Sequence, residues 1–334
     1  MDRMIVCFGE ILLRLAAPGA EFLLQTPRFD AAVAGAEANV AVSLACLGTP
    51  SRMVSVLPDN ALGRAARDEL RRYGVETGAM SFSSIGRMGI YFLTPPAGLR
   101  AAEVLYDRAD SAFVRADFTA IRWEEALHDA TRLHVSGVTA ALTQATAAAT
   151  LKAVEAARAL GLAVSLDCNH RAKLWAARGG DGPGDMKRLM SLAHCLFADR
   201  RDLAFALGQT FTDDRAAAKA AFAAFPDLEL MAHTSRSQEC ADAAELSATL
   251  HARGGVEHRA PALRLSGIVD RIGAGDAFAA GLLHALDAGR EPEAAIKFAL
   301  AACALKHFTP GDFNLAREVD VDAVLNGEGM GVRR

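Results

Sequence analysis

The chain has 334 residues, of which 51% are hydrophobic and 23% charged, and its formal net charge is −4. This length and composition are typical of a globular protein with a large core, arranged in one domain or two. The lack of positive charge excludes a general attraction to nucleic acid or to an anionic membrane surface.

Short apolar runs alternate with longer helical patterns along most of the chain. Strands are expected at 4–8, 52–56, 132–135, 162–167, 195–198 and 229–233, and helices at 37–47, 61–73, 144–160, 186–192 and 213–225. Gly48, Gly74 and Gly161 each follow a helix, where left-handed backbone is needed. The alternation predicts a parallel sheet covered by helices on both faces.

Residues 10–30 and 88–107 break this alternation. The first segment holds prolines and a glycine among short apolar pieces, and the second reads as two strands, GIYFLT and AEVLYD, joined by PPAGLRA. We expect a small β layer over one end of the main sheet. Tyr106 and Arg108 lie two residues apart and therefore share one strand face. Tyrosine also favours strands for its own sake, and the spacing leaves that alternative open.

The sequence lacks the signatures of several other classes of protein. It contains no G-x-x-x-x-G-K-[ST], G-x-S-x-G or H-E-x-x-H motif, and its six cysteines form no Cys-x-x-Cys pair. The absence of the first motif argues against P-loop nucleotide binding, and the absence of the next two argues against common hydrolases. The scattered cysteines favour a reducing compartment. Glu10 interrupts the apolar amino terminus, and no apolar stretch reaches the roughly 18 residues that span a bilayer. We therefore expect a cytoplasmic protein.

The stretch VDRIGAGDAFAAGLL places Gly-Ala-Gly and then a carboxylate where an apolar helix begins. Helix N-termini carry unpaired N–H groups, and glycine allows a ligand to approach the backbone closely. Gly273, Ala274 and Gly275 therefore predict a pocket for an anion such as phosphate. Asp276 would repel that anion, and its presence is explained by a general base that takes a proton from an attacking hydroxyl. The alternative is that Asp276 only caps the helix.

The late D-x-x-G-A-G-D motif and the early AGAEANVAVSLACLG together resemble the ribokinase-like (PfkB) family of small-molecule kinases. The resemblance runs from VCFGEILLRL to ALKHFTPGDFN, nearly the whole chain. It implies a ribokinase-like α/β fold, with a three-layer α/β/α core, a mainly parallel sheet and a small β-sheet lid. We expect the core to comprise residues 1–12, 31–87 and 109–334, and the lid residues 13–30 and 88–108.

Within this family the segments GIYFLTP, VLYDRADSAF and DCNHRAKLW are most similar to the 2-keto-3-deoxygluconate kinases. The resemblance implies that Asp276 is the catalytic base and that Gly273, Ala274 and Gly275 form the anion hole. It implies a substrate-binding set made of Gly35, Ala36, Asn39, Tyr91, Tyr106, Arg108, Arg171 and Asp312.

Arg108 and Arg171 suit a sugar acid, because guanidinium groups bind carboxylates with paired hydrogen bonds. A neutral hexose would not need two arginines. The alternatives are that Arg108 pairs with its neighbour Asp107 or Asp110, and that Arg171 is a helix cap or a surface cation.

The resemblance also implies ATP and Mg²⁺ as cofactors. It places Asn169, Thr234, Arg236, Gly273 and Gly275 at the nucleotide, and Asp202 at the metal, through water. Three parts of the sequence depart from the family pattern. Arg271 replaces a threonine, although an arginine there is typical of the 2-keto-3-deoxygluconate kinases. Asp199 and Asp202 stand where Asn-x-x-Glu is common, and the nucleotide loop after 229–233 reads TSRSQECADAAEL where a glycine-rich pattern is common.

The expected function is phosphorylation of the C6 hydroxyl of 2-keto-3-deoxy-D-gluconate by ATP. The alternatives are a kinase for another sugar (2-keto-3-deoxygalactonate, fructose or ribose) and a non-catalytic sugar or nucleotide sensor. The expected partners are the sugar acid and ATP, with no nucleic acid and no membrane. A homodimer or higher oligomer through the lid is a further expectation.

Overall fold

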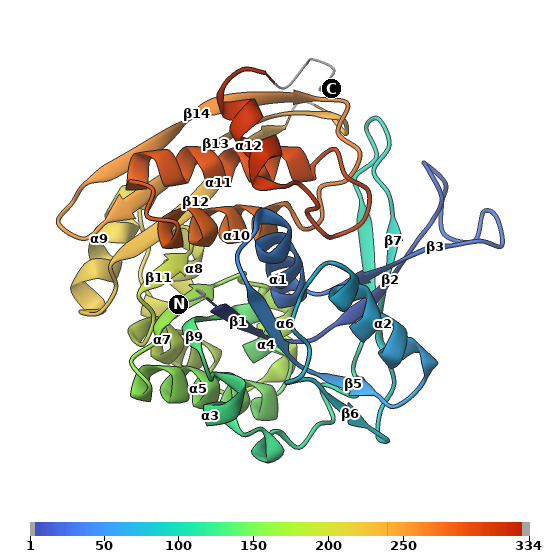
Figure 1. Ribbon diagram of the computed structural model, residues 1–334. Helices are drawn as coiled ribbons and strands as arrows, with labels where there is room; N and C mark the ends of the chain where they lie inside the picture. The colour runs from blue at the N-terminus through green and yellow to red at the C-terminus, as the bar shows by residue number, and fades with distance from the viewer. Residues whose placement is uncertain (1–3, 239, 329–334) are drawn as a thin grey trace.

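The computed structural model describes residues 4–238 and 240–328, and its centre is an eight-stranded sheet (Figure 1). The strand order is β14-β13-β12-β11-β10-β9-β1-β4. Neighbours from β4 to β12 are parallel, and β13 and β14 add antiparallel pairs at one edge. The strands are β1 Met4–Phe8, β4 Ser51–Val54, β9 Ala130–Ser136, β10 Ala163–Asp167, β11 Cys195–Phe197, β12 Leu230–Gln238, β13 Ala243–Ala252 and β14 Glu257–Ser266.

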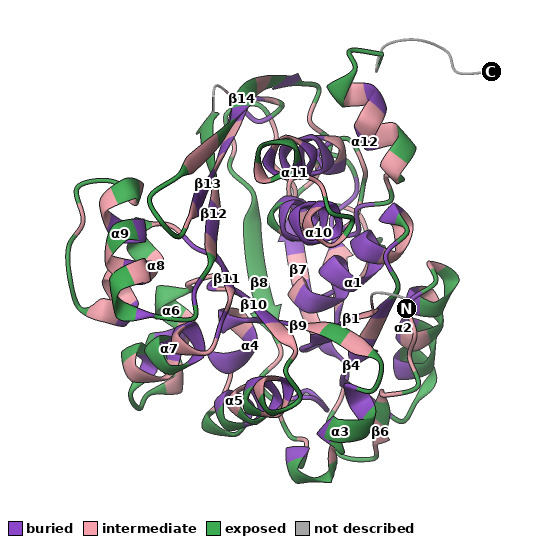
Figure 2. Ribbon diagram, turned by 60° about the vertical axis from the view of Figure 1, so that its left-hand side comes forward, coloured by how far each residue is buried: buried purple, intermediate pink, exposed green. Residues whose placement is uncertain are grey.

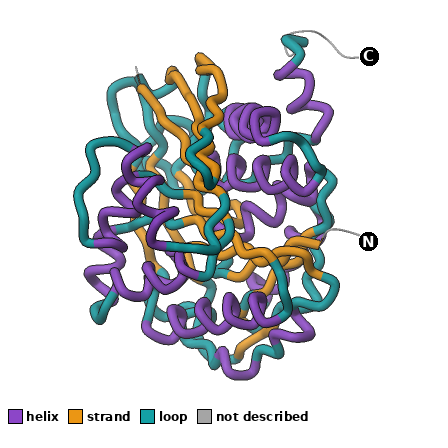
Figure 3. Tube along the Cα trace, turned by 90° about the vertical axis from the view of Figure 1, so that its left-hand side faces the viewer, coloured by secondary structure: helices purple, strands orange, loops and turns teal. Residues whose placement is uncertain are grey.

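Helices pack against both faces of this sheet (Figure 3). One face is covered by α1 Ala36–Leu47, α2 Ala61–Arg72, α10 Ala274–Asp287, α11 Pro292–Lys306 and α12 Glu318–Leu325. The other is covered by α3 Trp123–Ala126, α4 Gly137–Ala140, α5 Gln144–Ala159, α6 Ala172–Arg178, α7 Gly182–Ser191, α8 Arg200–Leu207 and α9 Asp214–Ala224. The predicted α/β class with a mainly parallel sheet is confirmed.

Burial explains why the central strands were readable from the sequence. The parallel strands are covered on both faces, so β1 and β11 are nearly continuous apolar runs. The antiparallel strand β13 alternates buried and half-buried residues. Helices α10 and α11 are buried along most of their length (Figure 2), and they approach closely at Gly281, where a Cβ would lie 3.0 Å from Ala299 Cα and Ala302 Cβ. A larger residue at 281 would separate the two helices.

A second, four-stranded sheet stands beside the α/β body, in the order β3-β2-β7-β8. Its strands are β2 Leu12–Ala16, β3 Asp30–Ala34, β7 Gly89–Thr94 and β8 Glu103–Asp107. The predicted hairpin is present, and all residues of the edge strand β8 are exposed. The first lid segment differs from the expected 13–30, because β3 pairs with β2 as far as Ala34. Alanine favours helices and is depleted in strands, so the sequence there gives no strand signal and only the pairing decides it.

Three further differences concern strand ends. The expected strand 52–56 is divided at Ser55, whose hydroxyl donates to the Gly9 carbonyl, and β5 Val56–Pro58 leaves to pair with β6 Ser81–Ser83. Strand β12 continues to Gln238, beyond the expected end at 233. The expected nucleotide loop TSRSQECADAAEL is therefore wrong in its described part: it forms the end of β12, a turn and the start of β13. No helix within the described ranges is long and apolar enough to cross a membrane.

Candidate active site

The Gly-Ala-Gly-Asp stretch forms the entry to helix α10. Gly273 is the residue before the helix, with a left-handed φ of +84°, and a Cβ there would lie 1.9 Å from the Asp312 carbonyl oxygen. Only glycine satisfies both conditions. Ala274 and Gly275 form the first turn, whose N–H groups have no partners within the helix. A Cβ built at Gly275 meets no atom within 4 Å, so the space beside this residue is open, whereas the Ala274 N–H donates to the Arg271 carbonyl oxygen at 3.3 Å.

Asp276, in the same turn, faces helix α1. Its Oδ2 accepts a hydrogen bond of 2.6 Å from Asn39 Nδ2, and no side chain caps the first turn of α10. The helix-cap alternative therefore does not describe this carboxylate. Burial raises the pKa of Asp276 to about 7, against the Asn39 hydrogen bond and the charge of Arg171, which lower it. A carboxylate with this pKa accepts a proton near neutral pH.

The start of α1 provides the opposite wall. Gly35 precedes the helix with φ +144°, and a Cβ there would lie 2.4 Å from the Glu10 carbonyl oxygen. Ala36 begins the helix, one turn before the buried Asn39. Asn39 Oδ1 is buried without a hydrogen-bond partner. A buried amide oxygen without a partner is costly, so a ligand hydroxyl donating to it would be favoured.

Tyr91 and Tyr106 form a cross-strand pair of β7 and β8, with ring centroids 5.8 Å apart. Tyr91 is buried and its hydroxyl lies 2.7 and 2.8 Å from the two carboxylate oxygens of Asp312. Tyr106 is 53% exposed. Asp312 is itself buried, and its carboxylate is bonded to protein groups. The resemblance implied that this carboxylate contacts the sugar.

Arg108 lies directly after β8, with its guanidinium carbon 5.4 Å from the centre of the Tyr106 ring. Its partner is Glu10, at 2.5 and 2.8 Å, and neither of the expected aspartates. Glu10 is buried and also accepts from the Ser111 hydroxyl. The predicted common face of Tyr106 and Arg108 is thus present, and Glu10 fixes the guanidinium there.

Arg171 is exposed at the position before α6 and makes no side-chain cap. Its charge nevertheless lowers the pKa of Asp276 and of Asp167, so the guanidinium lies on the side of the sheet edge where both carboxylates stand. Asn169 has a left-handed φ of +38°, and its N–H donates to Asp167 Oδ1 at 3.0 Å.

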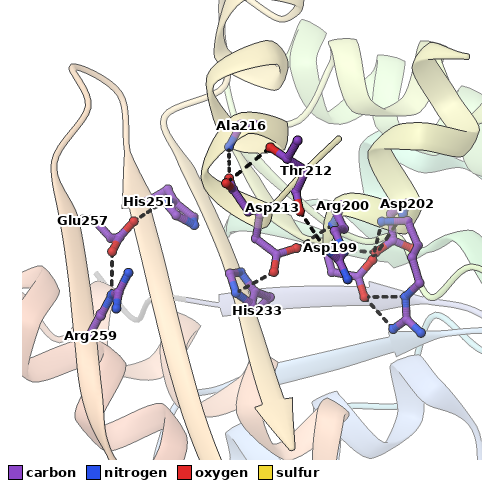
Figure 4. A network of polar contacts seen from close by, with 12 residues as sticks. Asp199, Arg200, Asp202, Thr212, Asp213, Ala216, His233, His251, Glu257 and Arg259 are labelled. Carbon is purple, nitrogen blue, oxygen red and sulfur yellow. Dashed lines mark hydrogen bonds and ion pairs between the residues drawn. The ribbon is translucent and has the colours of Figure 1, made fainter. Parts of the chain in front are cut away.

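Asp199 and Asp202 lie side by side at the start of α8 (Figure 4). Asp202 accepts from the N–H of Asp199 at 2.7 Å and from the N–H of His170 at 3.3 Å. Burial raises its pKa to about 7. Among the residues that the structure describes, no group of three or more His, Cys, Asp or Glu could hold a metal ion. A metal here would need ligands from a bound molecule as well.

Thr234 and Arg236 are exposed on β12. Arg271, which replaces the family's threonine, donates to the carbonyl oxygens of Cys240 and Ala241 in the β12–β13 turn. Arg236 lies near enough to lower the pKa of Arg271, after the larger effect of burial. These two arginines place positive charge beside the anion pocket.

The sequence reasoning missed several residues of this region. Glu10, between β1 and β2, and Arg14, within β2, are buried charges in an apolar part of the sequence, and Asp270 is the first aspartate of the late motif. Glu37 is also buried, and accepts from the hydroxyls of Ser136 and Thr139. A charged residue at an inward position of a strand, such as Arg in LLRLA, was the available signal.

Comparisons with known proteins agree with this geometry. Residues 2–315 match the model of the pfkB family carbohydrate kinases. The chain is 32% identical to a 2-dehydro-3-deoxygalactonokinase of Haloferax volcanii, over the whole of both chains. A 2-dehydro-3-deoxygluconokinase of Thermotoga maritima has a similar structure (TM-score 0.90, 32% identity, 97% of this chain and 100% of that chain). So does a PfkB family carbohydrate kinase of Listeria grayi (TM-score 0.92, 32% identity, the same shares). The chain belongs to the pfkB family of carbohydrate kinases.

Proposed function

We propose that this kinase transfers the γ-phosphoryl group of ATP to the C6 hydroxyl of 2-keto-3-deoxy-D-gluconate, with Asp276 as the general base. The observation that carries the proposal is the setting of Asp276. Its carboxylate lies in the first turn of α10, behind a glycine entry with open space beside Gly275, and burial raises its pKa to about 7. That combination suits a site where an anion is held while an alcohol loses its proton.

The residues of the chain divide the work between the two ends of the substrate. Amides of residues 273–275 would bind oxygens of the transferred phosphoryl group, and Asp276 would accept the hydroxyl proton. Asn39 holds the carboxylate through its amide N–H, and its unpartnered Oδ1 would accept from a substrate hydroxyl. Arg108, oriented by Glu10, would bind the acid group at the far end, with Arg171. Gly35, Ala36, Tyr91 and Tyr106 would line the sugar.

ATP would supply the phosphoryl group, and Mg²⁺ would neutralise charge on its phosphates. Asp276 and Asp202 lie near enough to Asp167 to raise its pKa, after the larger effect of burial, and the combined negative charge of these carboxylates at the sheet edge would favour this cation. Mg²⁺ usually takes one or two carboxylates together with phosphate oxygens and water, so Asp202 would act through water. Asn169, Thr234 and Arg236 would contact the nucleotide.

A panel of acceptors tests the substrate. We expect ADP release with 2-keto-3-deoxy sugar acids and much less with fructose or ribose. The galactonate epimer is the second candidate, because the Haloferax volcanii relative carries that name at the same identity as the gluconate kinase of known structure. No substrate-dependent ADP release with any sugar would favour the sensor alternative and contradict the proposal.

Replacing Arg108 by methionine tests the recognition of the acid. We expect the KM for the sugar acid to rise about 10- to 100-fold, since a charge-assisted hydrogen bond contributes about 1.5–3 kcal/mol. Turnover with neutral sugars should not change. Arg115→Met removes an exposed pair with Asp110 and serves as the control. Equal KM values for the acid in wild type and Arg108→Met would remove Arg108 from the proposed site.

The pKa of Asp276 predicts a pH profile. A base must be deprotonated, so kcat/KM should fall as the pH decreases below about 7. Asn39 donates to the ionised carboxylate and lowers its pKa. In Asn39→Ala, kcat/KM should therefore begin to fall at a higher pH than in the wild type. Asn60→Ala, which removes the cap of α2, is the control. If kcat/KM falls at the same pH in Asn39→Ala and in the wild type, a group other than Asp276 titrates.

A further inference from the structure

A buried charged cluster joins the small sheet to the loops on either side of α10 and α11. Arg14 of β2 is 7% exposed, and its Nη1 lies 2.6 Å from Asp270 Oδ2 and 3.0 Å from Asp312 Oδ1. These partners are 256 and 298 residues away in the sequence. Tyr91 of β7 donates to the same Asp312 carboxylate. Paired residues of two neighbouring strands of the small sheet therefore both contact Asp312, and Arg14 also contacts Asp270.

Both carboxylates belong to loops that shape the anion pocket. Asp270 accepts from the N–H of Ile272 at 3.0 Å and from the N–H of Gly311 at 3.1 Å. The Asp312 carbonyl oxygen packs so closely on Gly273 that no Cβ fits between them. Each partner of Arg14 is thus bonded to, or packed on, the backbone that leads into the first turn of α10. A movement of the guanidinium would be transmitted to those amides.

The cluster has equal numbers of acidic and basic side chains only when Arg14 is present. Lys306, fully buried at the end of α11, donates to the Thr309 carbonyl, and burial lowers its pKa while the charges of Asp270 and Asp312 raise it. Two carboxylates face one lysine and one arginine. Lys306 bonds to the loop that follows its own helix, and Arg14 is the cation that comes from the small sheet.

We propose that Arg14 is a positioning residue for phosphoryl transfer: it sets the loop entering α10 against the small sheet that covers the sugar. It acts through Asp270 and Asp312 and requires only the carbohydrate kinase activity of the family, not a particular sugar. A shift of about 1 Å in such a site costs about 10²-fold in rate. Arg14 should therefore affect kcat more than the binding of either substrate.

Arg14→Ala and Arg14→Lys test the proposal, with the acceptor that the wild-type enzyme phosphorylates fastest. Arg14→Lys keeps the positive charge, and with it the fold, but loses the planar guanidinium group and its fixed arrangement of N–H donors. We expect kcat to fall about 10- to 100-fold in both variants and both KM values to stay within about threefold. Guanidinium ion at low millimolar concentration should restore part of the kcat of Arg14→Ala. Arg132→Ala, which breaks a similarly placed pair with Asp287, should show neither effect.

Hydrogen exchange provides a second readout that needs no sugar. The amides of residues 271–275 and 311–312 should exchange faster in Arg14→Lys than in wild type, and not in the Arg132 variant. Failure of every acceptor with the wild-type protein would overturn the proposed function, while this exchange would still decide on Arg14. Unchanged kcat and unchanged exchange in Arg14→Lys would overturn the positioning role. A higher KM at unchanged kcat would also overturn it, because it would make Arg14 a direct ligand of substrate.

Discussion

Replacing Asp276 by asparagine is expected to lower kcat by about 10²- to 10⁴-fold, the range for the loss of a general base. Asparagine has the same shape, and its carbonyl oxygen still accepts from Asn39 Nδ2, but it takes no proton at neutral pH. The KM values for ATP and the sugar acid should change little, because the missing interaction develops only in the transition state. Steady-state ADP release measures both parameters.

The matched control is Asp287→Asn, at the other end of the same helix. Asp287 pairs with Arg132 at 3.0 Å, away from the anion pocket, so this variant should retain its kcat. Near-normal turnover in Asp276→Asn would show that the hydroxyl loses its proton to another acceptor. The thermal midpoints of both variants, measured beside the kinetics, separate a chemical loss from an unfolded protein.

Replacing Gly273 by alanine is expected to lower kcat/KM by at least about 10²-fold. The new Cβ would lie 1.9 Å from the Asp312 carbonyl oxygen, and a backbone atom cannot rotate away. The loop entering α10 or the loop that carries Asp312 must therefore move. The left-handed φ of +84° adds strain of about 1–2 kcal/mol for a residue with a Cβ.

Gly289→Ala separates this strain from the clash. Gly289 has a similar φ of +80°, just beyond the other end of α10, and a Cβ there meets no atom within 4 Å. We expect it to lose about 1 kcal/mol of unfolding free energy and no activity. Equal kcat/KM losses in the two variants would mean that backbone strain, and not the contact with Asp312, accounts for the effect of Gly273→Ala.

The positions of the buried strands along the chain and the glycine entry to α10 could be predicted from the sequence. Both signals are local: β1 is an apolar run because helices cover it on both sides, and Gly273 stands where the backbone needs a positive φ. The hairpin of β7 and β8 was equally local, since a turn-rich segment separates its two strands. The family motifs added the roles proposed for these residues.

Only the tertiary structure decided which distant residues and strand segments pair with one another. Arg108 was weighed against two neighbouring aspartates, and it binds Glu10, 98 residues earlier, because the small sheet folds over the end of β1. The end of β12 and the start of β13 were read as a loop, since TSRSQ is polar, and only their antiparallel pairing defines these parts as strands.

The sequence by itself predicted the α/β sheet and a helix N-terminus suited to an anion pocket, because periodicity and a short glycine motif are properties of neighbouring residues, and its resemblance to the PfkB family implied a carbohydrate kinase. Only the fold decided how that pocket is held. Arg14, Asp270 and Asp312 are buried together from three distant segments, and burial makes unpaired charge so costly that each requires the others. Such pairing depends on distance in space, which spacing along the chain does not record.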